Sequence, residues 1–211
     1  MTVEARTIRL VMELRGCGVT DTRVLSAIER IPRELFVPEP FLDQAYEDVA
    51  LPIGSGQTLS QPSVVARMIQ ALEVGERMKM LEVGTGSGYQ TAVLAQLCRR
   101  VYTVERHRQL LHDAEKRFAK LRLYNITSRV GDGTEGWAEQ APFERILVSA
   151  ASPEIPEALV AQLGEGGVMM IPLGADYGEQ SVTRVVRRQG DVEAEALWPV
   201  RFVPLRNGPA P

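Results

Sequence analysis

Three glycines at alternate positions, placed between an apolar run and a helical pattern, constrain the fold of this chain more than any other feature. Residues 81–88 read Leu-Glu-Val-Gly-Thr-Gly-Ser-Gly, so Gly84, Gly86 and Gly88 mark a turn from a strand into a helix. Glycine has no Cβ to block a ligand and adopts backbone angles that other residues avoid. The segment predicts a site where a nucleotide-like cofactor lies against bare main chain. The alternative is a tight strand-to-helix turn that binds nothing.

The spacing of these glycines argues against a dinucleotide. In the dinucleotide fingerprint the third glycine comes three residues after the second, and this chain has Tyr89 at that position. An acid, Glu82, precedes the first glycine by two positions. This combination points to S-adenosylmethionine. The residues that we expect at the cofactor are Glu82, Gly84, Thr85, Gly86, Ser87 and Gly88.

Two further acids stand just after predicted strands. Glu105 ends the strand that follows the glycine-rich loop and comes 17 residues after Gly88 (105 − 88). An acid in this place accepts hydrogen bonds from ribose hydroxyls in similar β-α-β units, and the alternative is a solvated charge at a strand end. The next strand is followed by Asp132 and Gly133, and we expect Asp132 to accept from the exocyclic amine of adenine.

Strand-like and helical segments alternate from residue 78 onward, which predicts a parallel sheet with helices on both faces. Helical patterns over residues 3–15 and 21–30 precede this body, and two strand-like runs without a helix between them follow residue 174. The fold class is therefore α/β: a Rossmann-like, mostly parallel, doubly wound sheet with antiparallel edge strands and an N-terminal helical lead-in. The expected strands are 78–83, 101–105, 126–130, 145–149, 167–172, 181–188 and 192–203, and the expected helices of the body are 89–99, 107–122 and 154–163.

The chain has 211 residues, and a domain of that size buries roughly 70% or more of its unfolded surface. We expect a single domain over residues 1–211. Within it, residues 1–60 form the helical lead-in and a substrate loop, and residues 61–175 form the cofactor-binding body. The edge strands and a tail occupy residues 176–211.

Charge and composition bear on the classes of partner. The net charge is −3, so nothing attracts the chain as a whole to a phosphate backbone. The nearest approach to a basic patch is Arg184, Arg187 and Arg188, which alternate with valines on a strand-like run and are interpreted as a solvated face. We therefore expect no nucleic-acid partner.

The sequence also shows no pattern typical of a metal site, a membrane span or a signal peptide. The cysteines and histidines, at 17, 98, 107 and 112, do not have the spacing of metal ligands or of a disulfide framework. No stretch reaches about 18 consecutive apolar residues, and the first residues lack the pattern of a signal peptide. We expect no metal, no membrane and a cytoplasmic location.

Residues 51–62 form the second segment with chemical content, and we expect a long loop that enters a helix. Pro62 suits the first helical turn, because its missing N–H costs nothing there. The residue before a proline is disfavoured in a helix, so Gln61 is the expected cap. Ser60 is then free to point elsewhere, and the alternative is that Ser60 itself caps the helix by accepting a backbone N–H.

The chain resembles the protein-L-isoaspartate O-methyltransferase family of the bacterial type, and the likeness covers essentially all of it. The Ser60 segment is the specific part, whereas the glycine-rich loop is shared with many methyltransferases. One departure is Ser63, where members of the family often have a larger Tyr or His. The matching segments are 32–37, 57–62, 84–92, 129–133, 142–143, 146–148, 152–156 and 201–205.

The resemblance implies methyl transfer from S-adenosylmethionine to the α-carboxylate of L-isoaspartyl residues in damaged proteins and peptides, with S-adenosylhomocysteine as the product. It implies that Ser60 is the active-site residue, that Glu105 holds the ribose and that Asp132 and Gly133 lie at the adenine. A carboxylate is already ionised near neutral pH, so the acceptor needs no general base. Ser60 is expected to position the acceptor and not to attack it.

Two other functions stay open. One is a small-molecule S-adenosylmethionine methyltransferase acting on a phenol, amine or thiol, which would need a pocket with a general base that residues 51–62 do not offer. The other is a non-catalytic module that keeps the fold and binds the cofactor or a partner without turnover. The presence of Ser60, Glu82, Glu105 and Asp132 argues against it.

Overall fold

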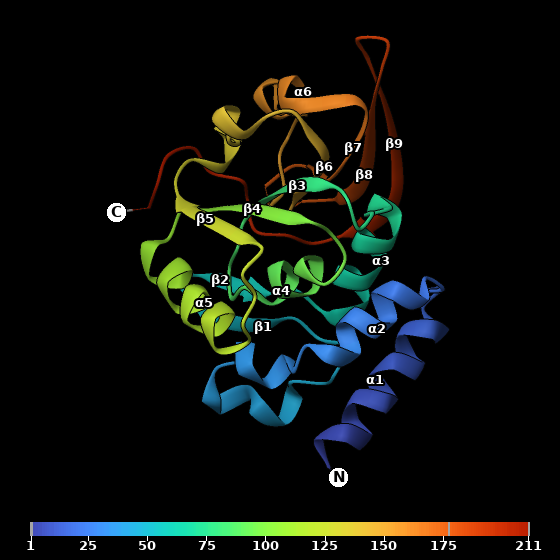
Figure 1. Cartoon of the computed structure of the whole chain (residues 1–211), viewed down its shortest axis with the longest axis vertical. Helices are drawn as coiled ribbons and strands as arrows, with labels where there is room; N and C mark the ends of the chain where they lie inside the picture. The colour runs from blue at the N-terminus through green and yellow to red at the C-terminus, as the bar shows by residue number, and fades with distance from the viewer. Residues whose placement is uncertain (1, 177, 211) are drawn as a thin grey trace.

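The three-dimensional structure, a computed structural model, describes residues 2–176 and 178–210. A sheet of seven strands forms its centre, in the order β5-β4-β3-β6-β7-β8-β9 (Figure 1). The first five of these pair in parallel, and β8 and β9 add antiparallel at one edge. The strands are β3 (Lys79–Val83), β4 (Arg100–Glu105), β5 (Ile126–Val130), β6 (Phe143–Val148), β7 (Leu163–Gly174), β8 (Gln180–Arg188) and β9 (Asp191–Val200).

Two helices and two short 3₁₀ turns form the N-terminal lead-in. The helix α1 (Val3–Gly16) has Thr2 as its N-cap, and α2 (Thr22–Arg30) has Asp21, whose side chain accepts from the Arg23 N–H. The 3₁₀ turns η1 (Arg33–Phe36) and η2 (Glu39–Gln44) follow. Figure 1 shows α1 and α2 beside α3 (Pro62–Leu72) at one side of the molecule.

Side chains of the central strands alternate between two hydrophobic cores, one on each face of the sheet. On β3, Met80 belongs to one core and Leu81 to the other; on β6, Leu147 and Ile146 divide in the same way. This is the period of two expected for strands buried on both faces. The two faces are covered unequally. The first core includes residues of α1, α2, α3, α4 (Tyr89–Ala95) and α5 (Arg108–Lys120). The second includes Leu159 of α6 (Glu157–Gln162), with Trp137 and Ala141 of irregular segments packed against it. The short 3₁₀ turns η3 (Gly133–Glu135) and η4 (Ala138–Gln140) lie between β5 and β6 in the chain.

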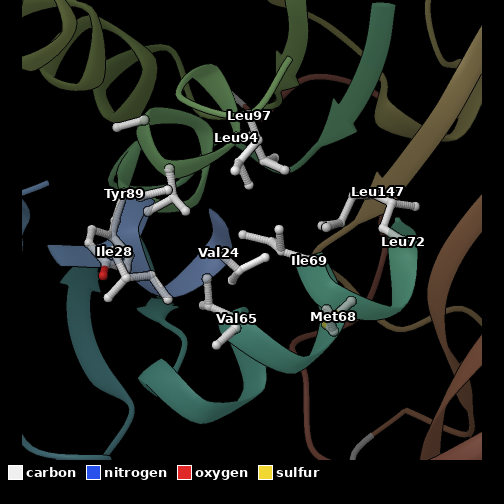
Figure 2. Close-up of a cluster of buried hydrophobic side chains, with 14 of the residues drawn as sticks. Val24, Ile28, Val65, Met68, Ile69, Leu72, Tyr89, Leu94, Leu97 and Leu147 are labelled. Carbon is white, nitrogen blue, oxygen red and sulfur yellow. The ribbon is translucent and has the colours of Figure 1, made fainter. Parts of the chain in front are cut away.

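The lead-in is part of the larger core. In Figure 2, Val24 and Ile28 of α2 face Val65 and Ile69 of α3, with Tyr89 at the start of α4 beside them. All five side chains are at most 2% exposed. Burial of each such aliphatic side chain stabilises the fold by about 1.5 to 3 kcal/mol, so α2, α3 and the start of α4 are fixed against one another.

The predicted order and type of the elements of the body are confirmed, but one loop and several bounds differ. The helix expected at 89–99 ends at Ala95, and the strand expected at 192–203 ends at Val200. Residues 51–59, expected as loop, form an antiparallel hairpin of β1 (Leu51–Gly54) and β2 (Gln57–Leu59). Ser55 and Gly56 both have positive φ, which is the conformation of a two-residue type I′ turn. The helix expected at 154–163 begins only at Glu157, because Pro156 precedes it as the cap and the residue before a proline is disfavoured in a helix. The strand expected at 167–172 runs from Leu163 to Gly174.

Candidate active site

A cavity lies beyond the carboxyl ends of β3 and β4, the edge at which open α/β sheets bind their ligands. The space within it, including open solvent at the mouth, is about 1060 Å³. We refer to residues 51–61 as the Ser60 loop and to residues 201–210 as the C-terminal tail. The cavity is lined by residues 56–60 and 65, by residues 83–87, 90, 104–106, 133, 149 and 150, and by residues 203–206 of the tail.

The glycine-rich loop has the backbone conformation that the sequence predicts. Gly84, Gly86 and Gly88 have φ angles of 94°, 54° and 89°, a region that side chains with a Cβ rarely adopt. Residues 84–87 line the cavity, but Gly88 does not. A Cβ at Gly88 would lie 2.7 Å from Cε1 of Phe118 on α5. The first two glycines therefore leave main chain open to a ligand, and the third lets α4 pack against α5.

Glu105 lies in the cavity wall with its carboxylate oriented by the backbone. Oε2 accepts from the Gly86 N–H at 2.8 Å, and Oε1 accepts from the His107 N–H at 2.9 Å. The side chain is largely buried, with the residue 5% exposed. A carboxylate has about four acceptor positions, so each oxygen retains one for a further donor. This arrangement fits the two neighbouring hydroxyls of a ribose.

Glu82 lies beneath the loop and does not line the cavity. Its Oε2 accepts from the hydroxyls of Thr91 at 2.5 Å and Thr103 at 2.8 Å, and its Oε1 accepts from Gln90 at 3.1 Å. Because the Thr103 hydroxyl donates to Glu82, the Thr85 hydroxyl at 2.6 Å from it is the donor of that pair. Glu82 thus supports the loop from behind.

Burial changes the ionisation of Glu82. Loss of hydration raises its pKa to about 7, against the lowering effect of the hydrogen bonds from Thr91, Thr103 and Gln90. The nearby charge of Glu105 raises the pKa further. The carboxyl group of Glu82, which supports the glycine-rich loop, therefore changes charge near neutral pH.

Asp132 is occupied by the protein itself. Its Oδ1 accepts from the N–H and the hydroxyl of Thr134, at 2.8 and 2.6 Å, and its Oδ2 accepts from the Gly208 N–H at 2.5 Å. Asp132 does not line the cavity, whereas Gly133 does. A Cβ at Gly133 would overlap Val83. The structure thus shows Asp132 fixing the C-terminal tail, and the adenine contact stays a prediction.

Ser60 lies in the cavity wall at the end of the hairpin. The expected N-cap of α3, Gln61, is confirmed, and its own side chain makes no capping hydrogen bond. The Ser63 N–H donates instead to Oδ1 of Asp48 at 2.7 Å. The alternative in which Ser60 caps the helix is therefore wrong, because Asp48 from an earlier segment performs that role.

Several lining residues were not predicted. Gln90, the second residue of α4, donates to Oγ of Ser149 at 2.6 Å as well as to Glu82, and both Gln90 and Ser149 line the cavity. Arg106 also lines the cavity. Its position directly after Glu105 at a strand end could have predicted this. Residues 203–206 line it from the far end of the chain, where the sequence has no local chemical pattern.

The basic run on β8 makes contacts within the protein. Arg184 lies 3.7 Å from a carboxylate oxygen of Glu73, and Arg187 donates to the Leu163 carbonyl at 2.7 Å. Arg188 pairs with a glutamate of β9 at 3.6 Å. Within residues 2–176 and 178–210, no group of three or more metal-binding side chains lies together. In the same residues, no helix has the length and apolar character needed to cross a bilayer.

A glycine-rich turn after β3, a carboxylate at the end of β4 and a cavity between them define the class: a Rossmann-like transferase of the S-adenosylmethionine-dependent type. A family model described as protein-L-isoaspartate(D-aspartate) O-methyltransferase matches residues 5–210. The chain therefore belongs to this family. The predicted family, fold class, enzyme class and cofactor are confirmed.

Individual relatives agree with this assignment. A protein-L-isoaspartate O-methyltransferase of Paramagnetospirillum magneticum is 64% identical over 206 residues, covering 97% of this chain and 96% of the relative. One of Rhodospirillum centenum is 61% identical over 212 residues, covering 100% and 96%. High identity over almost the full length of both proteins supports the same family.

Solved structures show the same fold. A structure from Plasmodium falciparum described under the same enzyme name, in complex with S-adenosyl-L-homocysteine, has a TM-score of 0.80 at 25% identity and covers 94% of this chain and 97% of that one. Another protein-L-isoaspartate O-methyltransferase has a TM-score of 0.85 at 27% identity. It covers 94% of this chain, which spans 65% of the length of that protein.

Proposed function

We propose that this chain transfers the methyl group of S-adenosylmethionine to the α-carboxylate of L-isoaspartyl residues in damaged proteins and peptides. One observation carries the proposal beyond family membership. Ser60 and Glu105 line one cavity, and apart from Glu105 its only ionisable lining residues among those described are Arg106 and Arg206. The cavity therefore holds hydroxyl, amide and cationic groups that suit an anionic acceptor.

The lack of a free base in the lining supports a carboxylate over other acceptors. A phenol, amine or thiol must lose a proton on methylation, and a positioned base normally accepts it. Glu105 is the only carboxylate in the described lining, and two backbone N–H groups already bind it. A carboxylate is ionised at neutral pH and needs no such group, which favours it over the small-molecule alternatives.

We assign the following roles to the residues of this chain. The Ser60 hydroxyl donates to one oxygen of the acceptor carboxylate and orients the other. Glu105 accepts from the ribose hydroxyls of the cofactor, and Glu82 holds the loop of Gly84 and Gly86 in place. The cofactor supplies an electrophilic methyl group on a sulfonium, and orientation of acceptor and donor contributes roughly 7 to 11 kcal/mol to the barrier reduction in well-aligned reactions.

The product explains why methylation leads to repair. The following backbone nitrogen attacks the new ester carbonyl, methanol leaves, and a five-membered succinimide forms. Water then opens the ring at either carbonyl, so part of the material returns to normal aspartate. The enzyme has to supply only the ester, because ring closure and opening proceed without it.

We also propose that nucleic acid is not a partner, because the net charge is −3 and the arginines of β8 already contact groups of the protein. The cytoplasmic location and the division of the single domain at residues 60 and 175 stay predictions from the sequence.

Paired peptides test the proposed function most directly. Two peptides of one sequence, one with L-isoaspartate and one with L-aspartate, have equal charge and differ in backbone path by one methylene. We expect radiolabelled methyl transfer to the isoaspartyl peptide alone. Equal rates on both peptides would contradict the substrate assignment, and no transfer to either would favour the non-catalytic alternative.

A further inference from the structure

Arg33 carries a positive charge that is buried without an ion pair. It is 0% exposed at the start of η1, and no carboxylate of residues 2–176 and 178–210 forms a salt bridge with it. Its Nη2 donates to the Ser60 carbonyl at 2.7 Å, whereas Nε and Nη1 have no hydrogen-bond partner in this part of the chain. Burial lowers the pKa of Arg33, but a guanidinium stays charged at neutral pH.

The contacts of Arg33 join the two halves of the active site. Its guanidinium carbon lies 4.5 Å from the ring centre of Tyr89, the first residue of α4 after the glycine-rich loop. The same ring packs edge-on against Phe36 at 5.5 Å. Arg33 therefore lies between the Ser60 loop and the cofactor loop, directly behind the Ser60 peptide.

The Asp48 carboxylate, which caps α3, attracts the Arg33 guanidinium and raises its pKa, but neither side chain lines the substrate side of the cavity. The lining residues there, 56–60 and 65, include no ionisable side chain. Charges interact more strongly in a buried environment than in water, because the effective dielectric constant is lower. A cation behind the Ser60 peptide thus makes this side of the cavity favourable for an anion, although Arg33 itself does not line it.

We infer that Arg33 is a positioning residue for the acceptor carboxylate: it holds the Ser60 peptide in place and supplies the positive charge that attracts the acceptor. The inference rests on the proposed function. Methyl transfer from a sulfonium to a carboxylate cancels both charges, so a fixed cation favours the bound anion more than the transition state. Arg33 should therefore act mainly on binding of the acceptor, and less on kcat.

A neutral substrate analogue separates this role from simple structural support. The experiment measures the dissociation constants of an isoaspartyl peptide and of its α-carboxamide analogue with the complex of the enzyme and S-adenosylhomocysteine. Arg33→Met removes the charge and the hydrogen bond, and Arg33→Lys keeps the charge. Arg145→Met is the matched control, because Arg145 also donates to a backbone carbonyl, that of Leu72 at 2.6 Å. Arg145 lies in the first half of β6, whereas the cavity is beyond the carboxyl ends of the strands.

We expect the wild type to bind the carboxylate peptide more tightly than the carboxamide. In Arg33→Met this preference should shrink by about tenfold, because the acceptor loses the attraction of a nearby charge and not a direct hydrogen bond. The KM for the isoaspartyl peptide should rise with it, kcat should change less, and the affinity for S-adenosylhomocysteine should stay near that of the wild type. Arg33→Lys should retain most of the preference, and Arg145→Met should retain all of it.

An unchanged preference in folded Arg33→Met, even with a lower melting temperature, would overturn the inference and leave Arg33 a structural residue. If Arg33→Met does not fold, Arg33→Gln takes its place, because glutamine is neutral and can still donate to the Ser60 carbonyl. The same loss of preference is expected, and its absence would count equally against the inference. Failure of the proposed function looks different, because the wild type itself would then fail to methylate the isoaspartyl peptide.

Discussion

Asp48 caps the helix that follows the Ser60 loop: its Oδ1 accepts from the Ser63 N–H at 2.7 Å across 15 residues of chain. Ser60 has the last side-chain hydroxyl before that helix. It is consequently not used for capping, and Ser60 lines the cavity. The capping of α3 and the role proposed for Ser60 thus belong to different residues, and each can be removed separately.

Replacement of Ser60 by alanine should reduce turnover without reducing stability. One hydrogen bond to the acceptor carboxylate is lost, so kcat/KM should fall by roughly 10- to 150-fold, with cofactor affinity nearly unchanged. Steady-state kinetics on an isoaspartyl peptide, together with thermal melting, measures both. Ser63→Ala is the control, since its hydroxyl only accepts from the Gln61 side chain, and it should keep near wild-type kinetics. Wild-type kcat/KM in Ser60→Ala would refute the assigned role.

Replacement of Asp48 by alanine should have the complementary effect on stability. Loss of a capping acceptor costs about 0.5 to 2 kcal/mol, and urea unfolding should show this loss relative to the wild type. Asp48→Asn keeps an oxygen that can accept from the Ser63 N–H and should recover most of it. If Asp48→Ala were as stable as the wild type, the cap would have no energetic weight.

Replacement of Glu105 by alanine should weaken cofactor binding. Charge-assisted hydrogen bonds contribute about 1.5 to 3 kcal/mol, so the dissociation constant of S-adenosylhomocysteine should rise by roughly 10- to 150-fold. Isothermal titration calorimetry reports this value without any need for turnover. Glu115→Ala, which removes an exposed carboxylate bonded to Ser128 on the surface, should bind as the wild type does. Equal affinity in Glu105→Ala would make Glu105 a support of the loop alone.

The raised pKa of Glu82 predicts a pH-dependent stability. Its pKa is about 7 in the folded protein and 4.5 as the ordinary value, so the folded state binds the proton more tightly. The tighter proton binding stabilises the folded state by about 3 kcal/mol. This stabilisation is complete below about pH 4.5 and is lost as the pH rises through 7. Glu82→Gln is neutral throughout, so urea unfolding at pH 5 to 8 should show the wild type losing stability relative to the variant. Parallel curves for the two proteins would contradict the shift.

Replacement of Gly88 by alanine should destabilise the fold through the contact between α4 and α5. The new Cβ would lie 2.7 Å from the Phe118 ring, in a backbone conformation with φ of 89°. Overpacking and positive φ together should cost more than about 2 kcal/mol. Gly16→Ala is the control, because Gly16 lies in α1 with nothing within 4 Å of an added Cβ. Thermal melting should therefore separate the two variants, and equal melting temperatures would argue against the packing role.

The sequence predicted the parts of the site that depend on local pattern. The glycine-rich loop and Glu105 each follow a strand, and the chain direction of a parallel sheet brings strand ends together without further information. The Asp48 cap and the Arg33 contact to Ser60 could not be predicted from spacing, because they join segments 15 and 27 residues apart. Strand β7 has 12 residues and is longer than the predicted strand at 167–172, because a strand continues wherever its neighbours offer hydrogen bonds.

The hairpin that carries Ser60 also limits what can be repaired. Its cavity-lining residues next to Ser60, from Gly56 to Leu59, carry no charge, so they offer little basis for selecting the amino acids that flank a lesion. Under the proposed function, these hairpin residues would accept lesions with neighbours of either charge. The acceptor must nevertheless enter a cavity, which a residue held inside a helix or strand cannot do. Repair of a folded client should therefore proceed no faster than local unfolding exposes the damaged segment.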